Sequence, residues 1–173
     1  MTLWLGMSVP ALALPSQSIS TVLAWSKKHA LVAPLQKARK LEPDEPDYES
    51  VIQIGGAIYN SNERLIFSVV VNPRSQKVES ETIYYANPQG IPSLDFYTGA
   101  GFRLIEAIYD RSVMNDFVKA QLVKTRKLGN TIPIRLYRGK QFGYQVMGGG
   151  SSDSTSNFTI ASPAQFEKLL TVR

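Results

Sequence analysis

The sequence predicts an α+β domain in which helices pack on an antiparallel sheet of about six to seven strands. The apolar pattern changes twice from helical spacing to strand-like alternation, which gives the order α-βββ-α-βββ(β)-α. Short, turn-rich segments separate the strands, as is typical of hairpins and therefore of antiparallel pairing. The 173 residues are 43% hydrophobic, which suits a single domain over residues 14–173.

The chain begins with an apolar block, residues 3–13, that ends in Ala11-Leu12-Ala13. Small residues in this arrangement are typical of a signal-peptidase site, so we expect residues 1–13 to be a signal peptide and the domain to be periplasmic or extracellular. Met1-Thr2 carries no positive charge, which departs from the signal pattern. The alternative is an apolar segment that packs on a cytoplasmic domain. No apolar run is long enough to cross a bilayer.

The first half of the domain is predicted to hold one helix and three strands. The helix covers 18–31, with Ser18 or Ser20 as its cap, and an acidic, proline-rich loop follows at 42–49. The strands cover 50–59, 64–71 and 77–86. Because the strand 64–71 is apolar at both alternating sets of positions, we expect it to be central and covered on both sides.

The second half repeats this order. A helix is predicted from about residue 98 to 117, with a break near 110–112, followed by strands at 120–128, 132–137, 141–147 and 157–161. Pro133 lacks an amide donor, so it should lie at an edge or at the start of its strand. Ser162-Pro163-Ala164-Gln165 has the pattern of a capping box and predicts a final helix.

Positive charge is concentrated in one stretch. The chain has 19 basic and 14 acidic residues, and 119–147 holds seven basic residues and no acidic one. Ile132, Ile134 and Leu136 should face the core. The alternate positions should form a basic outer face that presents Arg135, Tyr137, Gln141 and Gln145, with Arg138 and Lys140 at the tip of the hairpin. The candidate binding residues are Lys124, Arg126, Arg135, Tyr137, Arg138 and Lys140.

This basic face favours an exported, non-enzymatic binding or accessory domain that recognises an acidic protein or an anionic ligand. A charged face that only keeps the protein in solution is the simpler interpretation. An intracellular nucleic-acid binder is an alternative, because basic residues interleaved with tyrosine suit single strands. Export and the small number of aromatic residues on this face disfavour it. The sequence leaves the oligomeric state open.

The composition limits catalysis. Cysteine is absent and His29 is the only histidine, which excludes disulfides, thiolate chemistry and multi-histidine metal sites, so we expect no cofactor or metal. A small hydrolase with a carboxylate or serine site remains an alternative, since Glu79 and Glu81 share one face of a strand at a two-residue spacing. Two carboxylates on a polar outer face explain the same pattern.

Overall fold

A computed structural model of the chain describes residues 14–28, 35–37, 57–60, 65–85, 105–106, 108–109, 111–128, 132–148 and 156–172. The predicted signal segment, His29, the acidic loop at 42–49 and most of the loop at 148–156 lie outside these residues. No helix within the described ranges is both long and apolar enough to cross a membrane.

The predicted α+β fold with an antiparallel sheet is confirmed. In chain order the elements are α1 (Ile19–Lys28), β1 (Gln36–Lys37), β2 (Ala57–Asn60), β3 (Leu65–Val71), β4 (Val78–Tyr85), α4 (Arg111–Val118), β5 (Gln121–Leu128), β6 (Ile132–Arg138), β7 (Gly143–Met147), β8 (Ser156–Ala161) and α5 (Pro163–Thr171).

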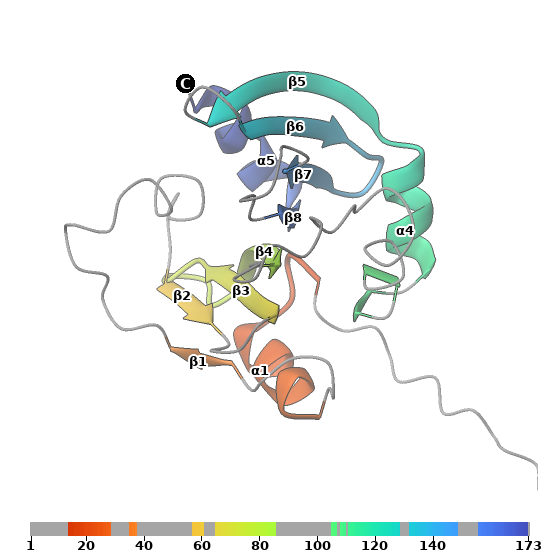
Figure 1. The fold of residues 1–173 in the computed structure, drawn as a ribbon. Helices are drawn as coiled ribbons and strands as arrows, with labels where there is room; N and C mark the ends of the chain where they lie inside the picture. Colours follow the sequence, from red (N-terminus) through yellow and green to blue (C-terminus); the bar gives the residue numbers. More distant parts are fainter. Residues whose placement is uncertain are drawn as a thin grey trace, which may run out of the picture.

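The strands form one sheet in the order β1-β2-β3-β4-β8-β7-β6-β5. It consists of two antiparallel meanders, β1 to β4 and β5 to β8, each preceded by a helix, α1 or α4 (Figure 1). The last strands of the two meanders, β4 and β8, pair antiparallel at the centre of the sheet. Consequently β5 lies at one edge, far from β1.

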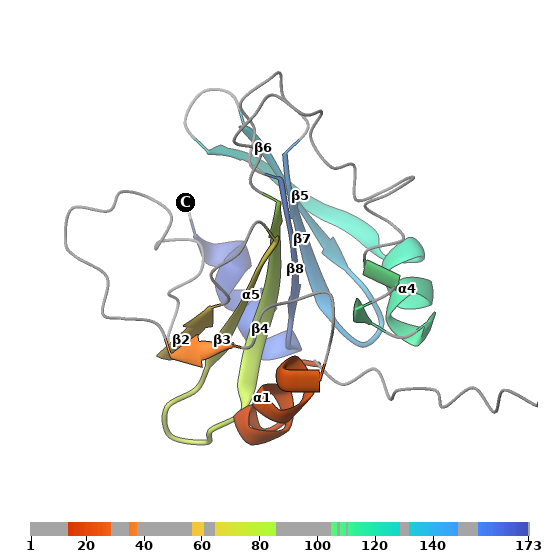
Figure 2. The ribbon, with the colours of Figure 1, turned by 60° about the horizontal axis from the view of Figure 1, so that its bottom comes forward.

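Helices cover both faces of the sheet (Figure 2). On one face, Val22 and Trp25 of α1 and Phe117 of α4 pack against sheet residues such as Phe67 and Phe158. On the other face, α5 packs through Phe166 and Leu169 onto Leu136 and Ala161. The described side chains of the predicted central strand, residues 67–71 of β3, are all buried, which confirms that it is covered on both sides.

The helix starts follow from local capping. The Ser18 hydroxyl accepts the Thr21 amide at 3.3 Å at the start of α1. At α5 the Ser162 hydroxyl accepts the Gln165 amide at 3.3 Å and Pro163 occupies the first turn, as predicted. The predicted break near 110–112 agrees with the start of α4 at Arg111.

Two details of the sheet differ from the prediction. Within the described residues the sheet has eight strands because β1, only two residues long, pairs with β2. Two residues are too few to show a period in the sequence. Gln145, expected on an exposed face, is 1% exposed. β7 is buried throughout because it lies inside a sheet whose two faces both carry helices.

Candidate functional site

The basic stretch Lys119–Met147 runs from the end of α4 through β5, β6 and β7 and so occupies one edge of the sheet. Its cations do not share one face. Lys124 and Arg126 lie opposite Leu136 and Ile134, on the side covered by α5, and Arg135 lies opposite Thr125 on the side of α4. The candidate residues therefore form two separate groups.

Lys124 and Arg126 bind the end of α5. The Lys124 ammonium donates to the carbonyls of Leu170 at 2.6 Å and Val172 at 3.2 Å, and Nη1 of Arg126 donates to the Val172 carbonyl at 3.1 Å. These carbonyls have no partner within the helix and carry its negative dipole end. Partial burial also lowers the pKa of Arg126. The two side chains act as a C-terminal cap for α5.

Arg138 contacts α5 as well. Its guanidinium donates to Glu167 at 2.5 Å and lies 5.4 Å from the centre of the Phe166 ring. The pair is half exposed, so it adds little to stability. Glu167 nevertheless neutralises the charge of Arg138 within the chain. Three of the five cations among the candidates thus have partners within the chain.

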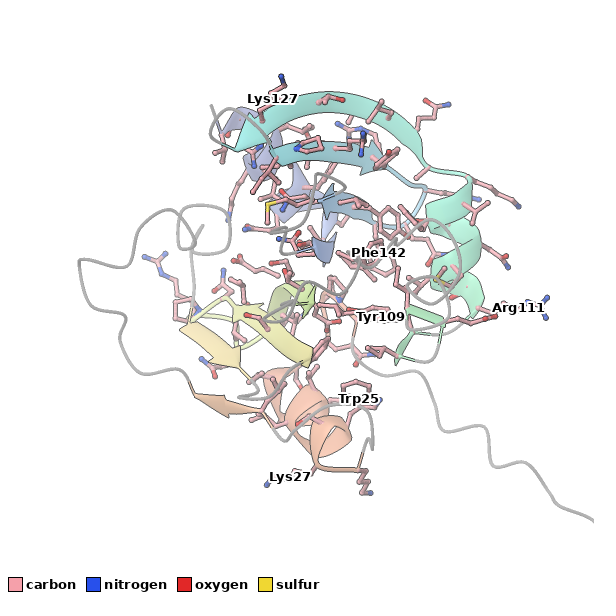
Figure 3. All side chains as sticks on the ribbon, viewed as in Figure 1. Trp25, Lys27, Tyr109, Arg111, Lys127 and Phe142 are labelled. Atoms are coloured by element: carbon pink, nitrogen blue, oxygen red, sulfur yellow. The ribbon has the colours of Figure 1, made fainter. Side chains whose placement is uncertain are left out.

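The remaining candidates lie on the α4 side or at the hairpin between β6 and β7. The Tyr137 ring packs edge-on against Phe117, with ring centroids 6.0 Å apart, so it is partly buried against the core. Arg135 is half-buried and Lys140 is exposed. Lys119 and Lys127, which were not among the candidates, are exposed too, and Lys127 points away from the sheet in Figure 3.

These four cations, Lys119, Lys127, Arg135 and Lys140, make no ion pair with any described residue. The large apolar side chains Val118, Leu122 and Val123 are 67%, 53% and 44% exposed, and they lie near Lys119 at the end of α4 and the start of β5. We call these seven residues the basic rim. Its apolar part could have been suspected from the sequence, because Leu122 and Val123 are adjacent and cannot both face the core of a regular strand.

A second group of polar residues lies inside the core between the sheet and α4. The carboxyl of Glu81 is fully buried beside the Tyr109 hydroxyl, and the Tyr144 hydroxyl bonds to Asp116 at 2.7 Å. Figure 3 shows Tyr109 directed into the protein. Two carboxyls and two phenols therefore share one buried region.

Burial controls the chemistry of this group. It raises the pKa of Glu81 to about 8, while the nearby Tyr109 hydroxyl lowers that pKa by a smaller amount. Neither carboxyl oxygen of Glu81 nor the Tyr109 hydroxyl has a well-formed hydrogen bond to a described residue. Burial also raises the pKa of Tyr144, as does its bond to Asp116. The low dielectric disfavours each charged form.

Asp116 organises the hairpin between β6 and β7. Besides Tyr144, it accepts the backbone amides of Lys140 at 2.8 Å, Gln141 at 3.2 Å and Phe142 at 3.3 Å. A Cβ on Gly139 would lie only 2.3 Å from its Oδ2. The sequence prediction missed Asp116, although its position between Met114 and Phe117, two inward-facing residues of α4, is an unusual place for an acid.

The predicted common face for Glu79 and Glu81 is wrong. The pairing of β3 with β4 shifts register between Val70 and Val71, so that Glu79 is the extra residue of a bulge. The Glu79 carboxylate accepts a hydrogen bond from the side-chain amide of Asn72 at 3.0 Å and lies 3.6 Å from the Lys168 ammonium of α5. Glu81 instead faces Tyr109. The two carboxyls therefore do not form a pair.

Catalytic and metal-binding arrangements are also limited by burial. Asp116 is 9% exposed and Glu81 is 0% exposed, so neither presents a carboxyl at the surface. Within the described ranges, no three acidic or histidine side chains gather in the way that a metal ion requires. Comparison of the chain with protein-family models, curated proteins and solved structures found no match.

Proposed function

We propose that this domain binds an acidic protein through the basic rim. The observation that carries the proposal is the combination of four cations without ion pairs to described residues and three exposed apolar side chains along the edge of the sheet. Complementary charge steers and selects a partner, while apolar contacts exclude water from the interface.

A protein suits this surface better than a small anion. A phosphate or carboxylate ligand would use the cations but leave Val118, Leu122 and Val123 in water. The interface of a protein partner can cover both kinds of side chain, because such interfaces combine apolar and polar contacts. Base stacking with nucleic acid has weaker support, since the Tyr137 ring packs against Phe117.

The proposal is tested by charge reversal. The double variant Lys127→Glu and Arg135→Glu should weaken binding of a short peptide of alternating glutamate and valine by about tenfold or more, measured by fluorescence anisotropy. Raising the salt concentration should weaken binding to the wild type in the same direction.

The matched control is Arg74→Glu with Lys77→Glu. These exposed cations lie on the turn between β3 and β4, in the other half of the sheet, and the net charge changes by the same amount. Equal loss of binding in the two double variants would mean that total charge, and not the rim, attracts the peptide. That result would reject the proposal.

Export is part of the proposal and rests on residues 3–13 alone. Amino-terminal sequencing of the native protein tests it, and a mature chain that begins near Leu14 is expected. A chain that still begins at Met1 would reject export without affecting the binding test.

A further inference from the structure

Among the described strands, β5 is an outer strand whose second side has no partner. Within the described part of the chain it pairs only with β6, and it lies at the end of the strand order, at the upper margin of the sheet in Figure 1. It is eight residues long, and its described side chains from Gln121 to Lys127 are exposed or half-buried. A long edge strand of this kind presents a row of backbone donors and acceptors.

The hydrogen bonds of β6 show which groups of β5 point outward. The Gly148 amide donates to the Pro133 carbonyl, and the Gly139 amide donates to the Phe142 carbonyl. The odd-numbered residues of β6 therefore bond toward β7, so Arg135 and Pro133 are not bonded to their partners on β5, Thr125 and Lys127. The amides and carbonyls of Thr125 and Lys127 consequently face away from the sheet.

The side chains along β5 show what an added strand would contact. Thr125 and Lys127 are both exposed, and Arg135 lies beside Thr125 on the next strand. The register shifts between Leu122 and Lys124, with Val123 as the extra residue of a bulge, and the two exposed apolar residues Leu122 and Val123 lie at that point. A strand laid along β5 would meet Lys127 near one end of β5, Arg135 of β6 beside its middle, and the apolar residues Leu122 and Val123 near the other end.

Charge selects the occupant of this edge. A second copy pairing through β5 would bring Lys124, Arg126 and Lys127 of two chains together, and like charges on paired strands destabilise the pair. An extended segment with alternating acidic and apolar residues meets opposite charge and apolar contacts instead. The edge therefore favours a different, acidic chain over self-association.

We propose that the domain binds its partner by strand addition: an extended acidic segment of another protein pairs with Thr125 and Lys127 and forms a ninth strand beside β5. This inference rests on the proposed binding function and specifies its geometry. Main-chain hydrogen bonds would supply affinity, and the rim cations would supply selectivity.

The test is removal of one outward amide. Thr125→Pro deletes a donor that β6 does not use, and a proline whose missing N–H faces outward is tolerated on an edge strand. It should weaken binding of the glutamate-valine peptide by about fivefold or more, the loss expected for one main-chain hydrogen bond. Thr125→Val is the matched control, because it retains the amide, and it should bind like the wild type. Circular dichroism and thermal unfolding establish that both variants are folded.

Hydrogen exchange gives a second measurement that needs no variant. In the free protein the amides of Thr125 and Lys127 should exchange faster than the amide of Arg126, which faces β6. The bound peptide should slow exchange at Thr125 and Lys127 and leave Arg126 nearly unchanged. Protection at both positions together with weak binding to Thr125→Pro supports strand addition.

Other outcomes separate this inference from the proposed function. If Lys127→Glu with Arg135→Glu abolishes binding while Thr125→Pro binds normally, the rim binds the peptide by side chains and strand addition is wrong. If neither variant weakens binding, the proposed function itself fails. A concentration-dependent dimer of the free protein that Thr125→Pro abolishes would assign the edge to a second copy and overturn the inference.

Discussion

At the scale of single residues, Glu81 places an acidic side chain inside an apolar core. Its neighbours across the sheet are Val69 on β3 and Ile160 on β8, both buried. Among the described residues, the titratable groups that face this region are the hydroxyl of Tyr109 and, further away, Tyr144 with Asp116. None of them is a cation, so burial dominates and raises the pKa of Glu81 to about 8.

Glu81 should therefore make stability depend on pH. The folded state holds the proton more tightly than the unfolded chain, in which the pKa is near 4.5. Its contribution to stability is complete below about pH 4.5 and is lost as the pH rises toward 8, by up to about 1.4 kcal/mol per pH unit. Glu81→Gln should flatten this part of the profile in urea unfolding at several pH values.

Glu106→Gln is the control for this experiment, because Glu106 is exposed. Its profile should follow the wild type. Parallel profiles for the wild type and Glu81→Gln between pH 5 and 8 would mean that the Glu81 carboxyl is not held protonated in the core.

At the scale of elements, α5 is held on the sheet by close contact and by charge. Gly143 of β7 lies under Phe166, so close that an added Cβ would be 2.0 Å from a ring carbon. The other end of α5 is capped by Lys124 and Arg126 of β5. Helix and edge strand therefore support each other, and this is why part of the basic stretch is structural.

Gly143→Ala should displace α5. The added methyl collides with the base of the Phe166 ring, which cannot move without shifting the helix, so we expect a loss of about 2–3 kcal/mol in the free energy of unfolding. Chemical denaturation measures this loss. Adding Phe166→Leu should cost less in the Gly143→Ala background than in the wild type. Additive losses in the double variant would exclude the contact as the cause.

At the scale of the whole molecule, the pairing of β4 with β8 joins two meanders into one sheet. At this seam the hydroxyls of Thr82 and Thr159 lie opposite each other, 2.9 Å apart and buried. Because the two residues are 77 positions apart in the chain, their bond forms only when both meanders are in place. The seam should make the domain unfold as one unit.

A double-mutant cycle tests the seam. Thr82→Val or Thr159→Val alone leaves one buried hydroxyl without its partner and should cost about 1–2 kcal/mol. The double variant should cost clearly less than the sum of the two, because it removes both polar groups together. Equilibrium unfolding followed by far-UV circular dichroism and by tryptophan fluorescence measures the cycle. Two separate transitions would contradict a single cooperative unit.

Much of the architecture was predictable because it depends on neighbouring residues. Alternation of apolar and polar residues identified most of the strands, and Ser162 with Pro163 identified the start of α5. Apolar residues at both alternating sets of positions in 64–71 identified β3 as central. The sequence also located the concentration of positive charge in Lys119–Met147.

What only the tertiary structure decided concerns contacts between distant segments. The bulge at Glu79, the docking of α5 on β7 and the position of β5 at the edge all depend on which strands pair and in which register. Through these contacts Lys124, Arg126 and Arg138 bind α5. Lys127 and Arg135 lie on the other face of the sheet and make no ion pair with a described residue. The sequence by itself determined the elements and their charge, because propensity and capping act locally. The tertiary structure decided which charges remain for a partner, because chain segments far apart in sequence compete for them.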